Sequence, residues 1–265
     1  MSNSPIITLL SDLGTKDASG SMAKAILMRH VPDAIFVDIS HHIARYNLQQ
    51  AAYLLLSAYR HFPKGTIHLL LVDVFSGETP RMLLAEKEGF FFIAPDNGLL
   101  PLSFGTELED TRLCMEFSKP YVFSEWIDAA GLVIGTLQNS NGKLPYQPCE
   151  LKRVPHLLQP KATPYGVECN ILYIDRYENI VLDITKAQFD EIVKNRPFKI
   201  KIMRLQDITT VRYNYNDVPH GDPLCRFNDA GFLEIALNHA QAATLLGLTS
   251  VDAANLRYQT IKIFF

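Results

Sequence analysis

The sequence predicts an α/β fold, with a mostly parallel N-terminal sheet flanked by helices and a smaller β-barrel-like domain at the C-terminus. In the first half, strand-length apolar runs alternate with helical patterns, which is typical of a parallel sheet covered on both faces. Beyond about residue 165, short apolar runs are separated by turn residues, as in small β domains. We therefore place an N-terminal domain at 1–150, a linker at 151–164 and a C-terminal domain at 165–265.

Each element is predicted from its hydrophobic spacing and from the residues that end it. The N-terminal order is a strand at 6–10, a helix at 19–30, a strand at 35–39, a helix at 47–61, a strand at 66–72, a strand pair at 82–85 and 89–94, and a helix at 125–133. The C-terminal strands are predicted at 167–174, 180–184, 200–205, 232–236 and 257–265, with one helix at 239–246.

Composition excludes several classes of function. The formal charge is −3, so the chain has no basic field to hold a phosphate backbone, and we expect no nucleic-acid partner. No apolar run approaches the roughly 18 residues of a membrane span, and the first residues lack the basic region of a signal peptide, so we expect a cytoplasmic protein without membrane contact. The four cysteines are scattered and the eight histidines dispersed, so we expect reduced thiols and no metal site.

Two aspartates follow predicted strands at the place where α/β sheets bind ligands. Asp12 comes just after the first strand and Asp73 just after the third. Ligands of such sheets lie beyond the carboxyl ends of the strands. A carboxylate there could accept two hydrogen bonds from a ribose diol, although Asp is also a common turn or helix-cap residue.

Six segments of the chain resemble one known family. Those that resemble its N-terminal domain are SDLGTKDASGSMAKAIL (11–27), DISHHIARYNLQQAAYLL (38–55), FPKGTIHLLLVDVFSGETPR (62–81) and APDNGLL (94–100). Those that resemble its C-terminal domain are YIDRYENIVLDI (173–184) and FNDAGFLEIALNHAQAA (227–243). The family is the S-adenosyl-L-methionine (SAM) hydroxide adenosyltransferases, relatives of the SAM-dependent fluorinase and chlorinase. The resemblance implies a homotrimer with SAM bound between one subunit's N-terminal domain and its neighbour's C-terminal domain.

The resemblance also implies roles for residues near the N-terminus. Asp12 matches the residue that binds the ribose, and Asp17 and Ser19 match polar residues near the methionine end of SAM. Tyr46 matches an aromatic residue beside the ribose and the sulfonium, where a ring face gains cation–π attraction. The alternatives are a helix cap for Asp17 and Ser19, and a core position for Tyr46.

The same resemblance assigns the reacting end of the site. Asp73 matches the catalytic aspartate, and Phe75 and Ser76 match residues beside the nucleophile. Arg81 is the candidate for the arginine that accompanies Asp73, with a surface arginine at a strand start as the alternative. The family's hydroxide-transferring members carry a histidine where this chain has Phe123. Ser124 takes the position of a halide-contacting serine, with a helix N-cap as the alternative.

In the C-terminal domain, the resemblance assigns an adenine site. Asp175 and Asn179 match the polar anchors of a turn in which Glu178 replaces the family's glycine, and Tyr177 offers an aromatic face. Asn228 and Glu234 fall in the stretch whose backbone reads the adenine edge. Simple turn residues and an exposed strand position for Glu234 are the alternatives.

The resemblance implies that water or hydroxide attacks C5′ of SAM and gives adenosine and L-methionine. SAM is then the substrate, and no cofactor is expected. A chloride-using halogenase is the first alternative, because Ser124 and the missing histidine follow the halogenase pattern. A non-catalytic protein that binds SAM or adenosine is the second.

Overall fold

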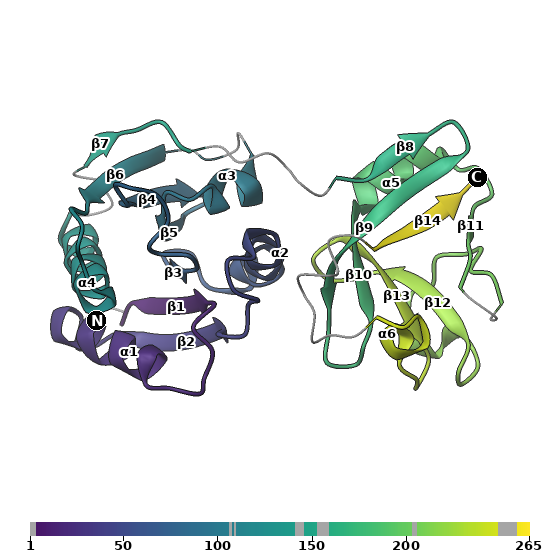
Figure 1. The fold of residues 1–265 in the computed structure, drawn as a ribbon, viewed down its shortest axis with the longest axis horizontal. Helices are drawn as coiled ribbons and strands as arrows, with labels where there is room; N and C mark the ends of the chain where they lie inside the picture. The colour runs from purple at the N-terminus through teal and green to yellow at the C-terminus, as the bar shows by residue number, and fades with distance from the viewer. Residues whose placement is uncertain are drawn as a thin grey trace. The chain divides into compact units, whose positions relative to one another are not determined.

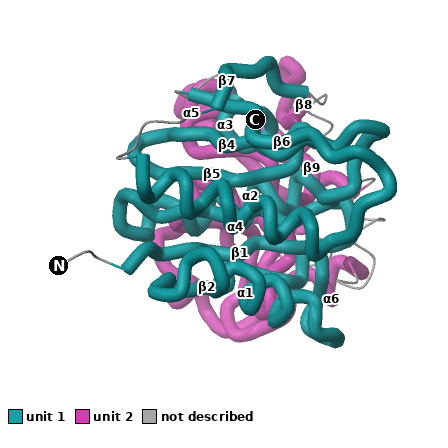
Figure 2. Tube along the Cα trace, turned by 90° about the vertical axis from the view of Figure 1, so that its left-hand side faces the viewer, with its two compact units in different colours: residues 1–155 teal, residues 156–265 magenta. Residues whose placement is uncertain are grey.

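The computed structural model describes residues 4–105, 108, 110–140, 146–152, 159–202, 206–248 and 259–265. The chain forms two compact units, Met1–Pro155 and His156–Phe265 (Figure 2). Each unit has its own sheet and its own hydrophobic core.

The first unit is built on a seven-stranded mixed sheet with the order β2-β1-β3-β5-β4-β6-β7. Strands β2, β1, β3 and β5 run parallel, and β4, β6 and β7 add antiparallel pairs. The strands are β1 (Ile6–Ser11), β2 (Ile35–Ser40), β3 (Ile67–Leu71), β4 (Arg81–Lys87), β5 (Phe90–Pro95), β6 (Asp110–Glu116) and β7 (Gln147–Pro148). The predicted α/β sheet is confirmed, and its parallel part holds the strands that precede Asp12 and Asp73.

Helices cover both faces of this sheet (Figure 1). Helices α1 (Ser19–His30) and α4 (Phe123–Asn139) pack on one face, and α2 (Leu48–Ala58) and α3 (Leu99–Phe104) pack on the other. A short 3-10 helix, η1 (Tyr59–His61), continues α2. Side chains alternate between the faces of a strand, so Leu9 joins the α1–α4 core and Leu10 the α2–α3 core.

The second unit is an antiparallel sheet with the order β11-β14-β9-β10-β13-β12, to which β8 adds beside β9. It forms the half-barrel expected of the predicted barrel-like domain (Figure 1). The strands are β8 (Lys161–Thr163), β9 (Gly166–Ile174), β10 (Ile180–Thr185), β11 (Lys199–Ile200), β12 (Pro223–Phe227), β13 (Phe232–Leu237) and β14 (Thr260–Phe264). Helices α5 (Lys186–Val193) and α6 (Ala242–Leu245) and the 3-10 helix η2 (Tyr215–Asp217) complete the unit.

Several elements differ from the prediction. Helix α4 is longer than the predicted 125–133, and α6 is shorter than the predicted 239–246. The expected strand at 200–205 contains only the end of β11, and residues 203–205 and 257–258 of the predicted strands lie outside the described residues. The sequence reading missed α3, β6, α5 and β12 altogether.

Strand β8 lies within the stretch expected to be a linker. It pairs with β9 through backbone groups, and all three of its residues are exposed. Such pairing leaves no hydrophobic pattern, which explains why the sequence did not predict it. Among the described residues, no helix combines the length and apolar character needed to cross a bilayer.

Candidate active site

The two aspartates expected to lie together do so in the first unit. Strands β1 and β3 are parallel neighbours, and Ser11 at the end of β1 pairs in register with Leu71 at the end of β3. The residues that follow therefore emerge at the same edge of the sheet. Oδ2 of Asp12 accepts a hydrogen bond from the backbone N–H of Asp73 at 3.4 Å.

The Asp12 carboxylate also holds a third loop. The backbone N–H of Tyr46 donates to the same Oδ2 atom at 3.1 Å. Tyr46 and Asp73 both have left-handed backbones, with φ of 61° and 48°. This conformation is uncommon for residues other than glycine, and it persists where surrounding contacts enforce it, often at functional sites. Within the described residues, no hydrogen bond reaches the other oxygen, Oδ1, which leaves an acceptor for a ligand.

Asp73 occupies an environment suited to a proton acceptor. Burial raises the pKa of its carboxyl, and the Ser76 side chain opposes this by a hydrogen bond. The negative charge of Asp12 raises the pKa of Asp73 further, whereas the positive charge of Lys152 lowers it. A carboxyl with a raised pKa is a stronger base once ionised, as general-base chemistry requires.

Asn97 supports the end of β3. Its side chain is buried, and Nδ2 donates to the carbonyl oxygen of Val72 at 2.8 Å and to that of Asp73 at 3.5 Å. Oδ1 accepts from the backbone N–H of Leu99 at 3.1 Å. Asn97 thus joins the start of α3 to the strand end that carries Asp73.

An aromatic wall lies beside the Asp73 loop. The ring of Phe75, which is 47% exposed, lies 5.1 Å from that of Tyr121, which in turn stacks on Phe117 at 4.9 Å. The hydroxyl of Tyr121 donates to the carbonyl oxygen of Val74 at 2.8 Å. Burial and the charge of Asp73 raise the pKa of Tyr121. The sequence reading missed Tyr121, because only the folded chain brings it to the loop after β3.

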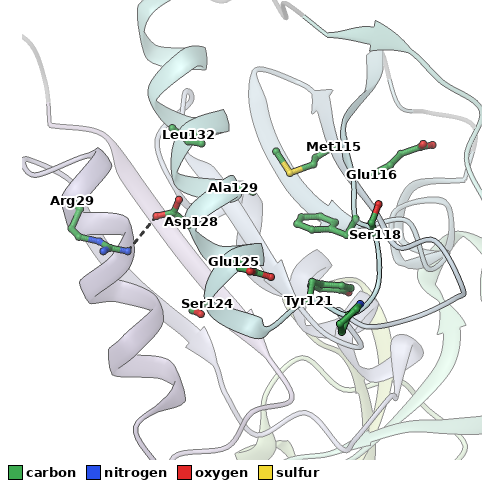
Figure 3. A pocket seen from close by; sticks show the side chains of 12 residues that line it. Arg29, Met115, Glu116, Ser118, Tyr121, Ser124, Glu125, Asp128, Ala129 and Leu132 are labelled. Atoms are coloured by element: carbon green, nitrogen blue, oxygen red, sulfur yellow. Dashed lines mark hydrogen bonds and ion pairs between the residues drawn. The ribbon is translucent and has the colours of Figure 1, made fainter.

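Ser124 lies in a hollow of about 580 Å³ beside α4. Figure 3 shows it at the start of the helix, next to Glu125 and near Tyr121. The alternative interpretation of Ser124 as the N-cap is wrong, because α4 begins at Phe123 and its N-cap is Val122, whose N–H donates to Glu125 Oε2 at 3.0 Å. No hydrogen bond among the described residues joins Ser124 to Asp73, and Phe123 packs on the α1–α4 core.

Arg81 is engaged away from Asp73. Its guanidinium pairs with Asp96 at 2.8 Å and donates to the carbonyl oxygen of Glu150, also at 2.8 Å. The backbone N–H of Lys152 donates to the other oxygen of Asp96 at 2.9 Å. Since the cationic charge that lowers the pKa of Asp73 comes from Lys152, that lysine is the stronger candidate for the cation of this site. Sequence reasoning missed it because Lys152 lies in the stretch expected to be a linker.

Asp17 and Ser19 lie at the start of α1. Oδ1 of Asp17 accepts from the backbone N–H of Ser19 at 2.9 Å, and this bond lowers the pKa of Asp17. The N-cap alternative is nevertheless wrong for both residues, because the N-cap position of α1 is Ala18. Asp17 is exposed, so its other oxygen is accessible to solvent.

In the second unit, the predicted turn between Asp175 and Asn179 is formed. The two oxygens of Asp175 accept from the backbone N–H of Asn179 at 2.8 Å and from its Nδ2 at 2.9 Å. Glu178 stands in the left-handed conformation that the family's glycine would adopt, with φ of 63°. Glu178 also accepts a hydrogen bond from the N–H of Thr244 at 2.8 Å, which helps to hold this backbone.

Glu234 is buried on β13, so its alternative interpretation as an exposed strand residue is wrong. It accepts a hydrogen bond from the Tyr215 hydroxyl at 2.6 Å, and burial raises the pKa of Glu234. The guanidinium of Arg226 lies 4.8 Å from the centre of the Tyr215 ring. Asn228 has a turn role, because its Oδ1 accepts from the N–H groups of Ala230 and Phe232, both at 3.1 Å.

Asp175, Asn179, Tyr215 and Arg226 help to line a hollow of about 990 Å³ in the second unit. Three lining residues were predicted, namely Asp175, Tyr177 and Asn179, and Tyr177 is 78% exposed. Sequence reasoning missed Tyr215 and Arg226. Strand register is the signal that could have identified Arg226, because the pairing of β12 with β13 places Arg226 opposite the predicted Glu234. Among the residues that the structure describes, no three His, Cys, Asp or Glu side chains come together as a metal site.

The fold and both sets of residues define a class of protein. Family models of the SAM hydroxide adenosyltransferases match the chain twice, the N-terminal domain model over residues 7–126 and the C-terminal domain model over residues 169–254. The chain therefore belongs to the SAM hydroxide adenosyltransferase family.

Individual relatives cover nearly the whole chain. It is 27% identical to the (R)-S-adenosyl-L-methionine hydrolase of Thermus thermophilus over 260 residues, which cover 91% of this chain and 95% of the relative. The hydrolase of the same name from Methanocaldococcus jannaschii is also 27% identical, over 96% of each chain. A fluorinase from Actinopolyspora mzabensis is 30% identical over 90% of this chain and 92% of its own.

Solved structures support the fold. An uncharacterized conserved protein from Thermotoga maritima matches with a TM-score of 0.79 at 22% identity, over 98% of both chains. A conserved hypothetical protein from Thermus thermophilus matches with a TM-score of 0.68 at 25% identity, over 99% of this chain and 100% of its own.

Proposed function

We propose that this protein hydrolyses SAM to adenosine and L-methionine. The observation that carries the proposal is the pairing of Asp12 and Asp73 at neighbouring strand ends, 3.4 Å apart from carboxylate oxygen to backbone nitrogen. One carboxylate keeps an oxygen available for a ribose diol, and the other has the raised pKa of a base. Membership of the SAM hydroxide adenosyltransferase family supports the choice of substrate.

In the proposed reaction, Asp12 binds the ribose hydroxyls and Asp73 orients a water molecule in line with C5′. A bond forms between the water oxygen and C5′ while the bond from C5′ to sulfur breaks, and sulfur takes the electron pair. The proton of water passes to Asp73 and then to solvent. Methionine leaves as a neutral thioether, so no general acid is required, and positioning and exclusion of bulk water carry most of the catalysis.

The cation of this site is proposed to be Lys152. Its charge lowers the pKa of Asp73 and so opposes the rise that burial causes. Arg81 then has an indirect role, because it holds Asp96, and Asp96 anchors the backbone of Lys152. Phe75, Ser76 and Tyr121 shape the niche for the nucleophile, and Phe123 leaves it without the family's histidine.

The adenine end is proposed to be held by the hollow of the second unit. Tyr177 provides an exposed ring face, and the turn of Asp175 and Asn179 provides hydrogen-bonding groups beside it. Asn228 and Glu234 support the neighbouring strands, and Asp17, Ser19 and Tyr46 are proposed to surround the methionine and sulfonium. In this proposal the protein is a homotrimer, and each site combines the first unit of one subunit with the second unit of its neighbour.

The test uses the full-length protein, SAM of each sulfonium configuration, and water enriched in ¹⁸O. We expect equal amounts of adenosine and methionine, with one ¹⁸O atom in the 5′-hydroxyl. Both configurations are included because the hydrolase relatives are named for the R form. Tight SAM binding without adenosine after hours of incubation would contradict the proposed hydrolysis.

A halide nucleophile is the second candidate, favoured by Ser124 at the halide-contacting position of the related halogenases and by the relationship to fluorinases. The same assay with added chloride separates the two. Formation of 5′-chloro-5′-deoxyadenosine at the expense of adenosine would replace water by chloride as the nucleophile. A protein that binds SAM but forms neither product would be a SAM or adenosine sensor.

A further inference from the structure

A chain of hydrogen bonds lies beside Asp12, buried at Ser11 and His41 and open to solvent at Asp38. Ser11, the last residue of β1, is fully buried, and its hydroxyl oxygen lies 2.6 Å from Nδ1 of His41. The other ring nitrogen of His41, Nε2, lies 3.2 Å from Oδ1 of Asp38. The second oxygen of Asp38 binds the ammonium group of Lys24 at 2.6 Å.

When the His41 ring is neutral, the chemistry of its partners determines which atom donates and which accepts in each hydrogen bond. The carboxylate of Asp38 can only accept, so Nε2 of His41 carries the ring proton and donates it. Nδ1 is then an acceptor and receives the hydroxyl proton of Ser11. The Ser11 oxygen in turn accepts from the backbone N–H of Leu13 at 3.4 Å. The chain therefore runs from β2, through the imidazole, into the turn that carries Asp12.

The order serine, histidine, aspartate is that of a hydrolase triad, but burial excludes this role. Ser11 has no exposed surface, so its oxygen cannot reach a substrate. His41 instead holds the Asp12 turn at a second point, because its backbone carbonyl accepts from the N–H of Gly14 at 2.7 Å. One residue thus holds the turn on both sides of Asp12.

We propose that Ser11 and His41 are positioning residues, which orient the free oxygen of Asp12 toward the ribose diol of the ligand. This inference rests on the proposed function, in which Asp12 binds that diol. A carboxylate that accepts two hydrogen bonds from one ligand must keep its orientation as well as its position. The contacts of Ser11 and His41 restrain the turn at the residues before and after Asp12.

The test measures the preference for a ribose diol in full-length protein. Dissociation constants for adenosine and 2′-deoxyadenosine are determined by calorimetry, and their ratio is the readout. For the wild-type protein we expect adenosine to bind at least about tenfold more tightly, the size of one hydrogen bond to a charged group. A change that only loosens the fold weakens both nucleosides alike and leaves the ratio unchanged.

A matched pair of variants isolates the contact to Ser11. The amide of His41→Asn lies near the position of Nδ1 and can still accept from Ser11, whereas that of His41→Gln lies near Nε2 and leaves Ser11 without this partner. We expect His41→Asn to keep most of the preference for adenosine. For His41→Gln and Ser11→Ala we expect the ratio of the two dissociation constants to fall by about threefold to tenfold. His42→Asn is the control, because His42 is exposed and its ring makes a hydrogen bond to Thr15 rather than to Ser11.

The outcomes separate the inference from the function on which it rests. If the wild-type protein shows no preference, or if Asp12→Ala binds both nucleosides as the wild type does, the proposed role of Asp12 fails. If the wild type prefers adenosine but Ser11→Ala and His41→Gln keep the full ratio, the positioning role is overturned. Should Ser11→Ala fail to fold, the comparison of His41→Asn with His41→Gln decides the question by itself.

Discussion

The two units present different kinds of binding surface. In the first unit, two carboxylates follow parallel strands. The Asp12 carboxylate accepts hydrogen bonds from the backbone N–H groups of Tyr46 and Asp73, both of which have left-handed backbones. In the second, a tyrosine, amide groups and a tight turn line a broad hollow between antiparallel strands. The first unit thus brings two carboxylates together at strand ends, whereas the second offers two aromatic rings, Tyr177 and Tyr215, among polar and charged side chains. This difference agrees with the proposal that the first unit carries the chemistry and the second recognises the base.

The sharpest test of this division is the variant Asp73→Asn. It keeps the size of the side chain but removes the base, so we expect kcat for SAM cleavage to fall by about 10²- to 10⁴-fold while the dissociation constant for SAM changes less than about threefold. Steady-state kinetics and calorimetry measure the two quantities. Asp190→Asn, an exposed site on α5, serves as the control. An equal loss in binding and turnover would place Asp73 among the binding residues instead.

The second largest effect is expected for Asp12→Asn. Loss of a charge-assisted contact to the diol should weaken SAM binding by about 10- to 100-fold. Because Oδ2 also ties the loops of Tyr46 and Asp73, the melting temperature should fall as well. Differential scanning fluorimetry and calorimetry separate these effects, since added SAM should raise the melting temperature less than in the wild type. Unaltered SAM affinity would remove the diol contact from the proposal.

The second unit is tested by Tyr177→Ala. Loss of a stacking surface for adenine is expected to raise KM by about tenfold with little change in kcat. Tyr165→Ala is the matched control, because Tyr165 is equally exposed, at 79%, and does not line the hollow. A large fall in kcat with constant KM would contradict the proposal that the second unit recognises the base and the first carries the chemistry.

The smallest expected effect is a shift of the pH profile in Lys152→Met. The positive charge of Lys152 lowers the pKa of Asp73, so its removal raises that pKa. Because the ionised form of Asp73 is the proposed base, the acidic limb of kcat should move to higher pH. Lys16→Met, at an exposed site in the loop before α1, is the control. An unchanged acidic limb would argue against Lys152 as the cation of the site.

Much of the first unit could be predicted, because its central parallel strands β1, β3 and β5 are buried on both faces and have strong apolar patterns. The strand ends fixed the places of Asp12 and Asp73, and adjacency in the sheet brought the two together. Helix α3 and strand β6 escaped prediction for local reasons. Helix α3 is a short apolar run with a proline, and the residues of β6 are only partly buried, so their alternation is weak.

The residues around the two aspartates were harder to predict. Tyr121 and Lys152 reach the Asp73 loop only through long-range packing, and nothing in their own sequence surroundings marks them. Arg81 looked suitable by proximity in sequence, but its position at the start of β4 directs it to Asp96 on the neighbouring strand end. Sequence spacing identifies strand ends, whereas the direction of a side chain depends on register and on competing partners.

Asp12 has a structural role that does not depend on a ligand. A single oxygen of this residue holds two left-handed turns, so the aspartate serves the architecture as well as any ligand. A descendant that abandoned the reaction would still lose folding free energy by replacing it. Retention of an aspartate after the first strand is therefore weak evidence of activity in this lineage.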